Sequence, residues 1–396
     1  MVDQNLMRGF PPLPEMQVTL ANWREPPYNR WAFRHVRQLV PSAPVPRGEG
    51  PARPLPSAPR DLGPVAFADK EGREQTVAAM LDRTYTDGFI VLQDGHVVAE
   101  VYDNGLTPDR PHILMSVTKS VAASLTGVLA DRGVIDPEAP IVDLLPEVAG
   151  SAYGDATIRH LLDMTVGIRF VEDYQDESGD MARYRMAGGW RPSGGTEAPA
   201  GLRGFLPSLV KEGEHGIAFH YVSPNSDLLG WVLERAAGVP FAELLGREIW
   251  APMGAEHEAY ITVDPLGAPR TAGGLCVSLR DLARFGALHL DTGGGGPAVV
   301  PGWWLRDMRE NGDPEAWRKG SFALEFPRAR YRSKWYLLGN AHGAYCGLGV
   351  FGQMLYVDPT ARLVIAKFSS QPKALDADLD DLTLRAFAAI GELLAG

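Results

Sequence analysis

The residues with the clearest chemical potential are a serine and a lysine three positions apart, Ser116 and Lys119, in the stretch SVTK. If this segment is helical, the spacing puts both side chains on one face. A serine hydroxyl becomes a nucleophile when a neighbouring base removes its proton, and a lysine becomes a base when its surroundings lower its pKa. The pair is therefore a candidate for nucleophilic acyl transfer.

The Ser-x-x-Lys pattern occurs three times, so its spacing alone does not identify a site. The copy at 370–373 contains Pro372 and follows a strand-like run, so it cannot form a helix. The copy at 208–211 ends a short helical run just before Gly213, where solvated side chains are expected. Only the copy at 116–119 begins a long and mostly apolar segment, which predicts a buried helix.

A buried helix that begins at Ser116 has chemical consequences. Its N-terminus supplies a positive potential that lowers the pKa of Lys119, and the free N–H of Ser116 can form half of an oxyanion hole. The alternative is structural: a serine that caps the helix, and a lysine whose stem is buried while its amine reaches solvent. The residues around the pair leave both interpretations open.

A third candidate group lies in FHYVSPNSDLLGWVLE, where Tyr221, Ser223 and Asn225 precede an amphipathic helix. A tyrosine beside a lysine can relay a proton between a nucleophile and a leaving group. The alternative is a turn in which Asn225 caps the helix and Tyr221 is part of the packing. Taken alone, this stretch favours the turn.

The stretch GLGVFG at 347–352 matches the G-x-G-x-x-G pattern of dinucleotide-binding proteins. That site needs a helix directly after the glycines, but here QMLYVDP follows and predicts a strand. We therefore expect a glycine-rich strand edge that another backbone or a ligand approaches closely.

Other chemistries find no support in the sequence. There is no G-x-S-x-G and no H-E-x-x-H motif, and His257-Glu258 lacks a second histidine. The two cysteines, Cys276 and Cys346, are far apart and are expected to be buried thiols. We expect no metal and no cofactor.

Composition restricts the partners. The 396 residues carry a net charge of −11, which would repel nucleic acid and anionic lipid. The first residues show no signal-peptide pattern, and no apolar run is long enough to span a membrane. We expect a cytoplasmic protein with a small-molecule ester or amide substrate and no nucleic-acid or membrane partner. The oligomeric state stays open, with a homodimer among the states considered.

The order of predicted elements gives an α/β (α+β) fold. Residues 1–70 form a Pro-rich, extended lead-in packed on the main domain. Residues 71–115 and 255–396 form an antiparallel lobe, with one hairpin in FIVLQDGHVVAEVY around Asp94-Gly95 and another in QMLYVD and RLVIAKFSS. Residues 116–254 are mainly helical and are inserted between the two parts. We expect the site in the cleft between the lobes.

SVTK, YVS and a late glycine-rich strand stand in the order found in serine β-lactamases and DD-peptidases, and the chain resembles the class C-type branch of that superfamily. Longer stretches resemble the 6-aminohexanoate-dimer (nylon-oligomer) hydrolases and their esterase relatives over nearly the whole chain. These stretches are NWREPPYNRWAFRHVRQLVPSA, HILMSVTKS, VEDYQDESGD, AGGW, FHYVSPNSDLLGW, SLRDLARF and GLGVFGQMLYVDP. The resemblance implies a β-lactamase/DD-peptidase-like fold, with an antiparallel sheet flanked by helices.

The resemblance also implies a two-step acyl transfer. Ser116 would be the nucleophile, Lys119 its partner and Tyr221 the proton shuttle to the leaving group, with either Lys119 or Tyr221 taking the first proton. The backbone N–H groups of Ser116 and Val350 would form the oxyanion hole. Tyr174 resembles a loop tyrosine that closes over substrate, and Trp190 resembles a wall of the pocket. The substrate-binding residues expected from these motifs are Tyr174, Trp190, Ser223, Asn225, Gly347 and Gly349.

Two departures from the β-lactamase pattern argue against efficient penicillin hydrolysis. Ser223 stands where β-lactamases carry the asparagine of Y-x-N, and Gly347 stands where they carry a lysine. An amide substrate with a free ammonium would need an acid, and EDYQDESGD at 172–180 offers five, although Arg183 and Arg185 follow closely.

We therefore expect a serine hydrolase for short-chain carboxylic esters, with the amide of linear 6-aminohexanoate oligomers as a further substrate. The alternatives are a β-lactamase or DD-peptidase and a catalytically silent scaffold.

Overall fold

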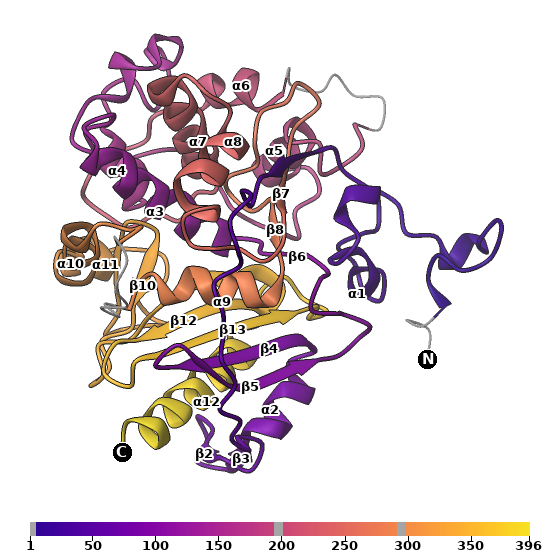
Figure 1. Cartoon of the computed structure of the whole chain (residues 1–396). Coiled ribbons are helices and arrows are strands. Elements are labelled where there is room, and N and C mark those ends of the chain that lie inside the picture. The colour runs from indigo at the N-terminus through magenta and orange to yellow at the C-terminus, as the bar shows by residue number, and fades with distance from the viewer. Residues whose placement is uncertain (1–4, 194–200, 291–297) are drawn as a thin grey trace.

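The computed structural model describes residues 5–193, 201–290 and 298–396, and its main feature is a seven-stranded antiparallel sheet (Figure 1). The strand order is β5-β4-β13-β12-β11-β10-β9. The strands are β4 (Thr86–Gln93), β5 (His96–Tyr102), β9 (Arg330–Arg332), β10 (Trp335–Leu337), β11 (Tyr345–Gly349), β12 (Gln353–Asp358) and β13 (Leu363–Ser369).

Both predicted hairpins are present. Strands β4 and β5 are joined at Asp94 and Gly95, whose φ angles of 49° and 77° match the two-residue turn that suits the strand twist. Strands β12 and β13 form the second hairpin, and β13 pairs with β4, with Ile365 opposite Val91. One sheet therefore unites two parts of the chain that are far apart in sequence.

Helices cover both faces of this sheet, which is why its central strands are apolar at successive positions. On one face, α9 (Leu279–Ala287) packs against the cluster that contains Ile90 and Leu92. On the other, α12 (Ala377–Ala395) packs against Phe89 and Val91, together with α2 (Val77–Arg83) (Figure 1). A two-stranded ribbon, β2 (Ala66–Ala68) and β3 (Glu74–Thr76), lies beside α12.

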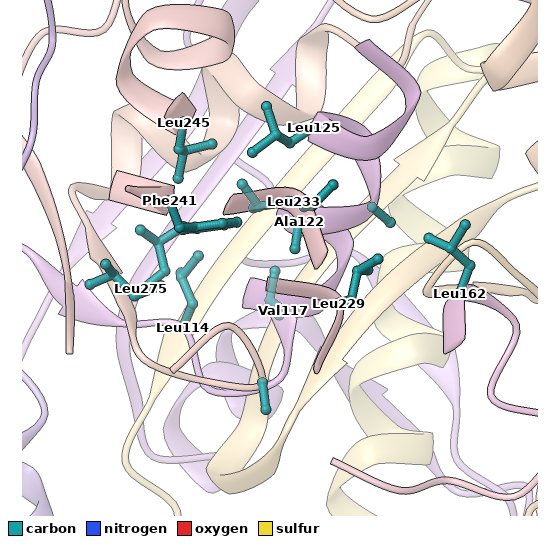
Figure 2. Packing of buried hydrophobic residues seen from close by; sticks show 14 of the residues in the cluster. Leu114, Val117, Ala122, Leu125, Leu162, Leu229, Leu233, Phe241, Leu245 and Leu275 are labelled. Carbon is teal, nitrogen blue, oxygen red and sulfur yellow. The ribbon is translucent and has the colours of Figure 1, made fainter. Parts of the chain in front are cut away.

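The described residues between 116 and 254 contain helices and no strand. The helices are α3 (Val117–Asp131), α4 (Ile158–Leu162), α5 (Asp180–Ala187), α6 (Gly201–Phe205), α7 (Pro224–Ala237) and α8 (Phe241–Leu245). Figure 2 shows Val117 and Leu125 of α3 packed with Leu229 of α7 and Leu245 of α8. This packing fixes α3 against α7, and both helices begin at the cavity described below.

A second antiparallel sheet joins the helical region to the N-terminal segment. Its order is β1 (Ser42–Val45), β7 (Ala259–Thr262), β8 (Leu275–Val277) and β6 (His112–Ile113). β1 contains Pro44 and lies at the edge, where a missing N–H is tolerated. Before it, α1 (Asn29–Ala32) and buried Trp23 pack against Trp190 and Met115.

Two further helices, α10 (Gly302–Glu310) and α11 (Pro314–Arg318), lie beside β10 (Figure 1). No helix among the described residues is long and apolar enough to cross a membrane.

Candidate active site

Ser116 lies at the start of α3, directly after Met115, whose φ of 45° is in the left-handed region. Residues with a side chain rarely adopt this conformation, so the surrounding structure must hold the turn. The turn presents Ser116 at the N-terminal end of the helix, where 8% of the residue is exposed. The serine is therefore shielded from bulk water but open to a cavity.

Lys119 lies one helical turn after Ser116 and is 1% exposed. Its Nζ donates hydrogen bonds to Ser116 Oγ at 2.8 Å and to the carbonyl oxygen of Ala272 at 2.6 Å. The amine does not reach solvent, and Ser116 makes no side-chain capping hydrogen bond. Of the two interpretations that the sequence left open, the structural one is wrong.

The surroundings of Lys119 favour its neutral form. Burial lowers the pKa of Lys119 from 10.5 to about 8, and the charge of Arg270 acts in the same direction. Glu172 and Asp227 act to raise it. With a pKa near 8, a fraction of the amine is unprotonated at neutral pH and can accept a proton.

Tyr221 is the third side chain of this group. Its ring centre is 5.1 Å from Lys119 Nζ, and it lines the same cavity as Ser116. Burial and the charge of Glu172 raise the pKa of Tyr221, while a hydrogen bond with Ser116 acts to lower it. The phenol is therefore protonated at neutral pH, as a proton donor to a leaving group must be.

Glu172 connects the loop before α5 to the start of α7. Its Oε1 accepts hydrogen bonds from Tyr174 Oη and from Ser223 Oγ, both at 2.6 Å, and its Oε2 accepts the Ser223 N–H at 2.6 Å. The sequence placed Glu172 in an acidic loop that could bind ammonium. Both of its oxygens instead bind Tyr174 and Ser223. The only sequence signal for this role is that Glu172 stands two residues before Tyr174 in VEDY.

Asp227, Arg270 and Ala272 form a supporting network that sequence reasoning missed. Asp227 Oδ1 accepts the Ala272 N–H at 2.7 Å, and Asp227 Oδ2 accepts hydrogen bonds from Arg270 Nη1 at 2.7 Å and from Tyr184 Oη. The Asp227 side chain is fully buried. The carbonyl of Ala272 accepts a hydrogen bond from Lys119, so Asp227 positions Lys119 indirectly, through Ala272. No motif links Asp227 to Ala272, which lie 45 positions apart.

The glycine-rich strand end lies against Ser116. A Cβ at Gly349 would lie 2.7 Å from the Leu114 carbonyl oxygen and 3.0 Å from the Ser116 nitrogen, so a side chain has no room there. No hydrogen bond given for the described residues uses the Ser116 N–H. Val350 follows Gly349 and lines the cavity with Ser116. This arrangement suits the expected oxyanion hole.

Two expected substrate contacts lie away from the cavity. Gly347 is buried against α3, where a Cβ would meet Ser120 Oγ at 2.7 Å, so its role is close packing. Asn225 is fully buried inside α7 and accepts a hydrogen bond from Tyr153 Oη at 3.1 Å. Neither residue lines the pockets around Ser116.

Ser116 lies between two pockets. The larger, of about 350 Å³, is mainly apolar and also contains Tyr221 and Tyr174. The smaller, of about 30 Å³, contains Trp190 and Ser223. Tyr174 and Val350 line both. Ser116 thus faces one pocket on each side.

Trp190 forms a fixed wall of the smaller pocket. Its Nε1 donates to Thr262 Oγ1 at 3.1 Å, and its ring makes an edge contact with Trp23 at 5.3 Å. Trp23 Nε1 in turn donates to the Trp190 carbonyl at 3.2 Å. The N-terminal segment therefore supports the site, which its Pro-rich composition did not indicate.

The described residues contain no group of three or more His, Cys, Asp or Glu side chains that could hold a metal ion. Cys276 and Cys346 are buried free thiols, as expected.

The chain is similar to several known proteins. A family model described as Beta-lactamase matches residues 73–390. A 6-aminohexanoate-dimer hydrolase from Paenarthrobacter ureafaciens is 38% identical over 358 residues, which cover 90% of this chain and 89% of that protein.

Solved structures show the same fold. A Bacillus anthracis protein provisionally assigned as a 6-aminohexanoate-dimer hydrolase superposes with a TM-score of 0.88 at 26% identity, covering 96% of this chain and 97% of the other. A family VIII carboxylesterase gives a TM-score of 0.56 at 21% identity, over 76% of this chain and 92% of the other. The expected β-lactamase/DD-peptidase-like fold is confirmed.

Proposed function

This chain belongs to the beta-lactamase family, and from that premise we propose that it is a serine hydrolase that cleaves short-chain carboxylic esters through an acyl-enzyme on Ser116. The observation that carries the proposal is the 2.8 Å contact between Lys119 Nζ and Ser116 Oγ at the edge of a 350 Å³ cavity. A buried lysine with a pKa of about 8 is a suitable base for a serine nucleophile.

In the first step Ser116 Oγ attacks the carbonyl carbon of the ester, and its proton passes to Lys119 Nζ. Lys119 is a better first acceptor than Tyr221, because the pKa of Tyr221 is raised and its phenol stays protonated. The oxyanion receives hydrogen bonds from the N–H groups of Ser116 and Val350.

In the second part of the step Tyr221 gives its proton to the departing oxygen and regains one from Lys119. The alcohol leaves and Ser116 carries the acyl group. Water then attacks the acyl carbon, with Lys119 or Tyr221 accepting its proton, and the carboxylic acid is released. Every group required belongs to the chain, so the cycle uses no added cofactor.

The amide of linear 6-aminohexanoate oligomers is the second candidate substrate. It is favoured by the 38% identical relative, which covers 90% of this chain. The discriminating experiment compares kcat/KM for the linear 6-aminohexanoate dimer and for 4-nitrophenyl butyrate, with wild type and Ser116→Ala. Turnover of both substrates makes this an oligomer hydrolase, whereas turnover of the ester alone makes it a carboxylesterase.

A fluorophosphonate probe separates a hydrolase from a silent scaffold. We expect one adduct on the intact protein and none on Ser116→Ala, and an unlabelled wild type contradicts the proposal. A β-lactam substrate in the same assay tests the remaining alternative. Gly347 offers no cation to hold a β-lactam carboxylate, and we expect little turnover.

A further inference from the structure

The two pockets beside Ser116 carry opposite charges. Of the residues that the structure describes, the charged ones lining the smaller pocket are Arg24, Arg185 and Arg270, with no acid among them. The charged residues described around the larger pocket are Glu172, Glu325 and Asp380, and its described lining contains no lysine or arginine. A substrate that spans the nucleophile therefore meets positive potential on one side and negative potential on the other.

Two of the three arginines have no acidic partner within the described part of the chain. Arg270 is paired with Asp227 at 2.7 Å. Arg24 makes no hydrogen bond or ion pair among the described residues, and its Nε is buried without a partner. Arg185 is 3% exposed, and the only acceptors given for it are the carbonyls of Met181 at 3.2 Å and Tyr174 at 3.4 Å. Among the described residues, the buried Arg185 guanidinium has no compensating anion, and the half-buried Arg24 has its Nε shielded from water without a partner.

One acid, Glu177, lies close enough to act on both arginines, but it does not neutralise them. Its charge raises the pKa of Arg24 and Arg185, while burial and, for Arg24, the charge of Arg185 lower it. Glu177 forms its ion pair with Arg191 at 2.7 Å and is 66% exposed. A buried cation without a partner is costly, so an anion that enters this pocket gains strongly from it.

The position of Tyr221 assigns the pockets to the two parts of a substrate. Tyr221 lines only the larger pocket, and under the proposed function it protonates the leaving group there. The smaller pocket then receives the acyl group. It is much smaller than the other pocket, about 30 Å³ against about 350 Å³, so the acyl chain must be short.

We propose that the acyl group of the substrate carries a carboxylate, which Arg24 and Arg185 bind in the smaller pocket. The substrate class is a monoester or monoamide of a short dicarboxylic acid. Arginine suits this task because its planar group can bind both oxygens of a carboxylate. The proposal rests on the proposed serine hydrolase function and specifies its substrate. It also makes the 6-aminohexanoate dimer a poor substrate, because the ammonium of its acyl half would face these arginines.

The test uses three ethyl esters that differ only at the end of a three-carbon acyl unit: monoethyl succinate, ethyl butyrate and the ethyl ester of β-alanine. They present a carboxylate, a methyl and an ammonium group, and released ethanol reports turnover. For wild type we expect kcat/KM to fall in that order, with a preference of about tenfold or more for succinate over butyrate. Equal values, or a preference for butyrate or β-alanine, overturn the proposal.

Substitutions test whether Arg24 and Arg185 cause the preference for succinate over butyrate. Arg24→Gln and Arg185→Gln should each lower the succinate-to-butyrate ratio of kcat/KM about tenfold. Arg183→Gln is the matched control, because Arg183 is exposed on the same helix as Arg185 and lines neither pocket. A ratio that falls as far in Arg183→Gln as in the other two contradicts the assignment.

The wild-type comparison needs no variant to fold, so it decides the proposal by itself. Failure of the underlying function looks different: no ester is turned over and no fluorophosphonate adduct forms on Ser116.

Discussion

Asp227 holds Ala272 in place through a 2.7 Å hydrogen bond from the Ala272 N–H to a fully buried carboxylate. The carbonyl of the same residue accepts a hydrogen bond from Lys119 Nζ at 2.6 Å. The base of the candidate site is thus positioned by an acid that does not touch Ser116. Arg270 binds the same carboxylate of Asp227, so one network sets both the position of Lys119 and the charges around it.

Replacing Asp227 should affect both activity and stability. In Asp227→Asn the carbonyl that orients Lys119 is held less firmly, and kcat/KM for 4-nitrophenyl butyrate should fall about 100-fold. The buried Arg270 also loses its partner, which should cost about 3–5 kcal/mol of unfolding free energy.

The pH profile separates positioning of the base from general damage. Asp227 raises the pKa of Lys119 and Arg270 lowers it. The acid limb of kcat/KM should therefore move to lower pH in Asp227→Asn and to higher pH in Arg270→Gln. Shifts in the same direction for both variants contradict this account.

Several parts of the site could be read from the sequence because they depend on local spacing. Ser116 and Lys119 are one helical turn apart, and the apolar segment after them predicts a buried helix. The turn at Asp94-Gly95 likewise needs only adjacent residues. These features follow from backbone geometry over a few positions.

The rest depends on contacts between distant segments, which no local pattern encodes. Arg24 reaches the site from the N-terminal segment because Trp23 packs on Trp190. Gly347 and Gly349 lie two positions apart on β11 and therefore face the same side, but Gly347 lies against Ser120 and Gly349 lies against Ser116. Only the packed structure shows which of the two glycines lies beside the nucleophile.

Activity should depend on the protonation state of Lys119. The amine must be neutral to accept the Ser116 proton, so kcat/KM should rise with pH and level off above an apparent pKa of about 8. The profile is measured with ethyl butyrate from pH 6 to 9.5. An apparent pKa of kcat/KM near 10.5, the ordinary lysine value, would mean that burial does not lower the pKa of Lys119 in the working enzyme.

Lys119→Met should abolish turnover but stabilise the fold at low pH. The pKa of Lys119 is about 8 in the folded state, against 10.5 for an ordinary lysine in the unfolded chain. Below pH 8 the buried charge therefore costs about 3 kcal/mol, and this cost disappears as the pH rises through 10.5. The hydrogen bonds to Ser116 and Ala272 are lost at every pH.

The gain in unfolding free energy of Lys119→Met over wild type should consequently be larger at pH 6 than at pH 10. Urea unfolding at the two pH values measures it. A gain that is the same at both, or larger at pH 10, contradicts the lowered pKa.

A methyl group at Gly349 should disable the candidate oxyanion hole. Its Cβ would lie 2.7 Å from the Leu114 carbonyl oxygen and 3.0 Å from the Ser116 nitrogen, both backbone atoms that cannot move freely. We expect Gly349→Ala to lower kcat for esters about 100-fold or more.

Gly347→Ala is the informative comparison, because its Cβ would meet the Ser120 hydroxyl, which can rotate. Its kcat should fall much less than that of Gly349→Ala. Gly150→Ala, with no atom within 4 Å of the added Cβ, should behave as wild type. Equal losses in kcat at 347 and 349 would place the two glycines in the same role.

Tyr221→Phe tests whether the phenol protonates the leaving group. An alkoxide departs poorly without a proton, whereas 4-nitrophenolate departs readily without one. The loss of kcat/KM should therefore be about 100-fold or more for ethyl butyrate and much smaller for 4-nitrophenyl butyrate. The parameter kcat/KM is the right one because it reports acylation for both esters, and it excludes the shared hydrolysis of the butyryl-enzyme. If Tyr221 were instead the base that activates Ser116, both esters would lose the same factor, since the attack on their carbonyl is the same. Equal losses would therefore mean that Tyr221, and not Lys119, accepts the first proton. Lys119 would then act as the electrostatic partner of Tyr221.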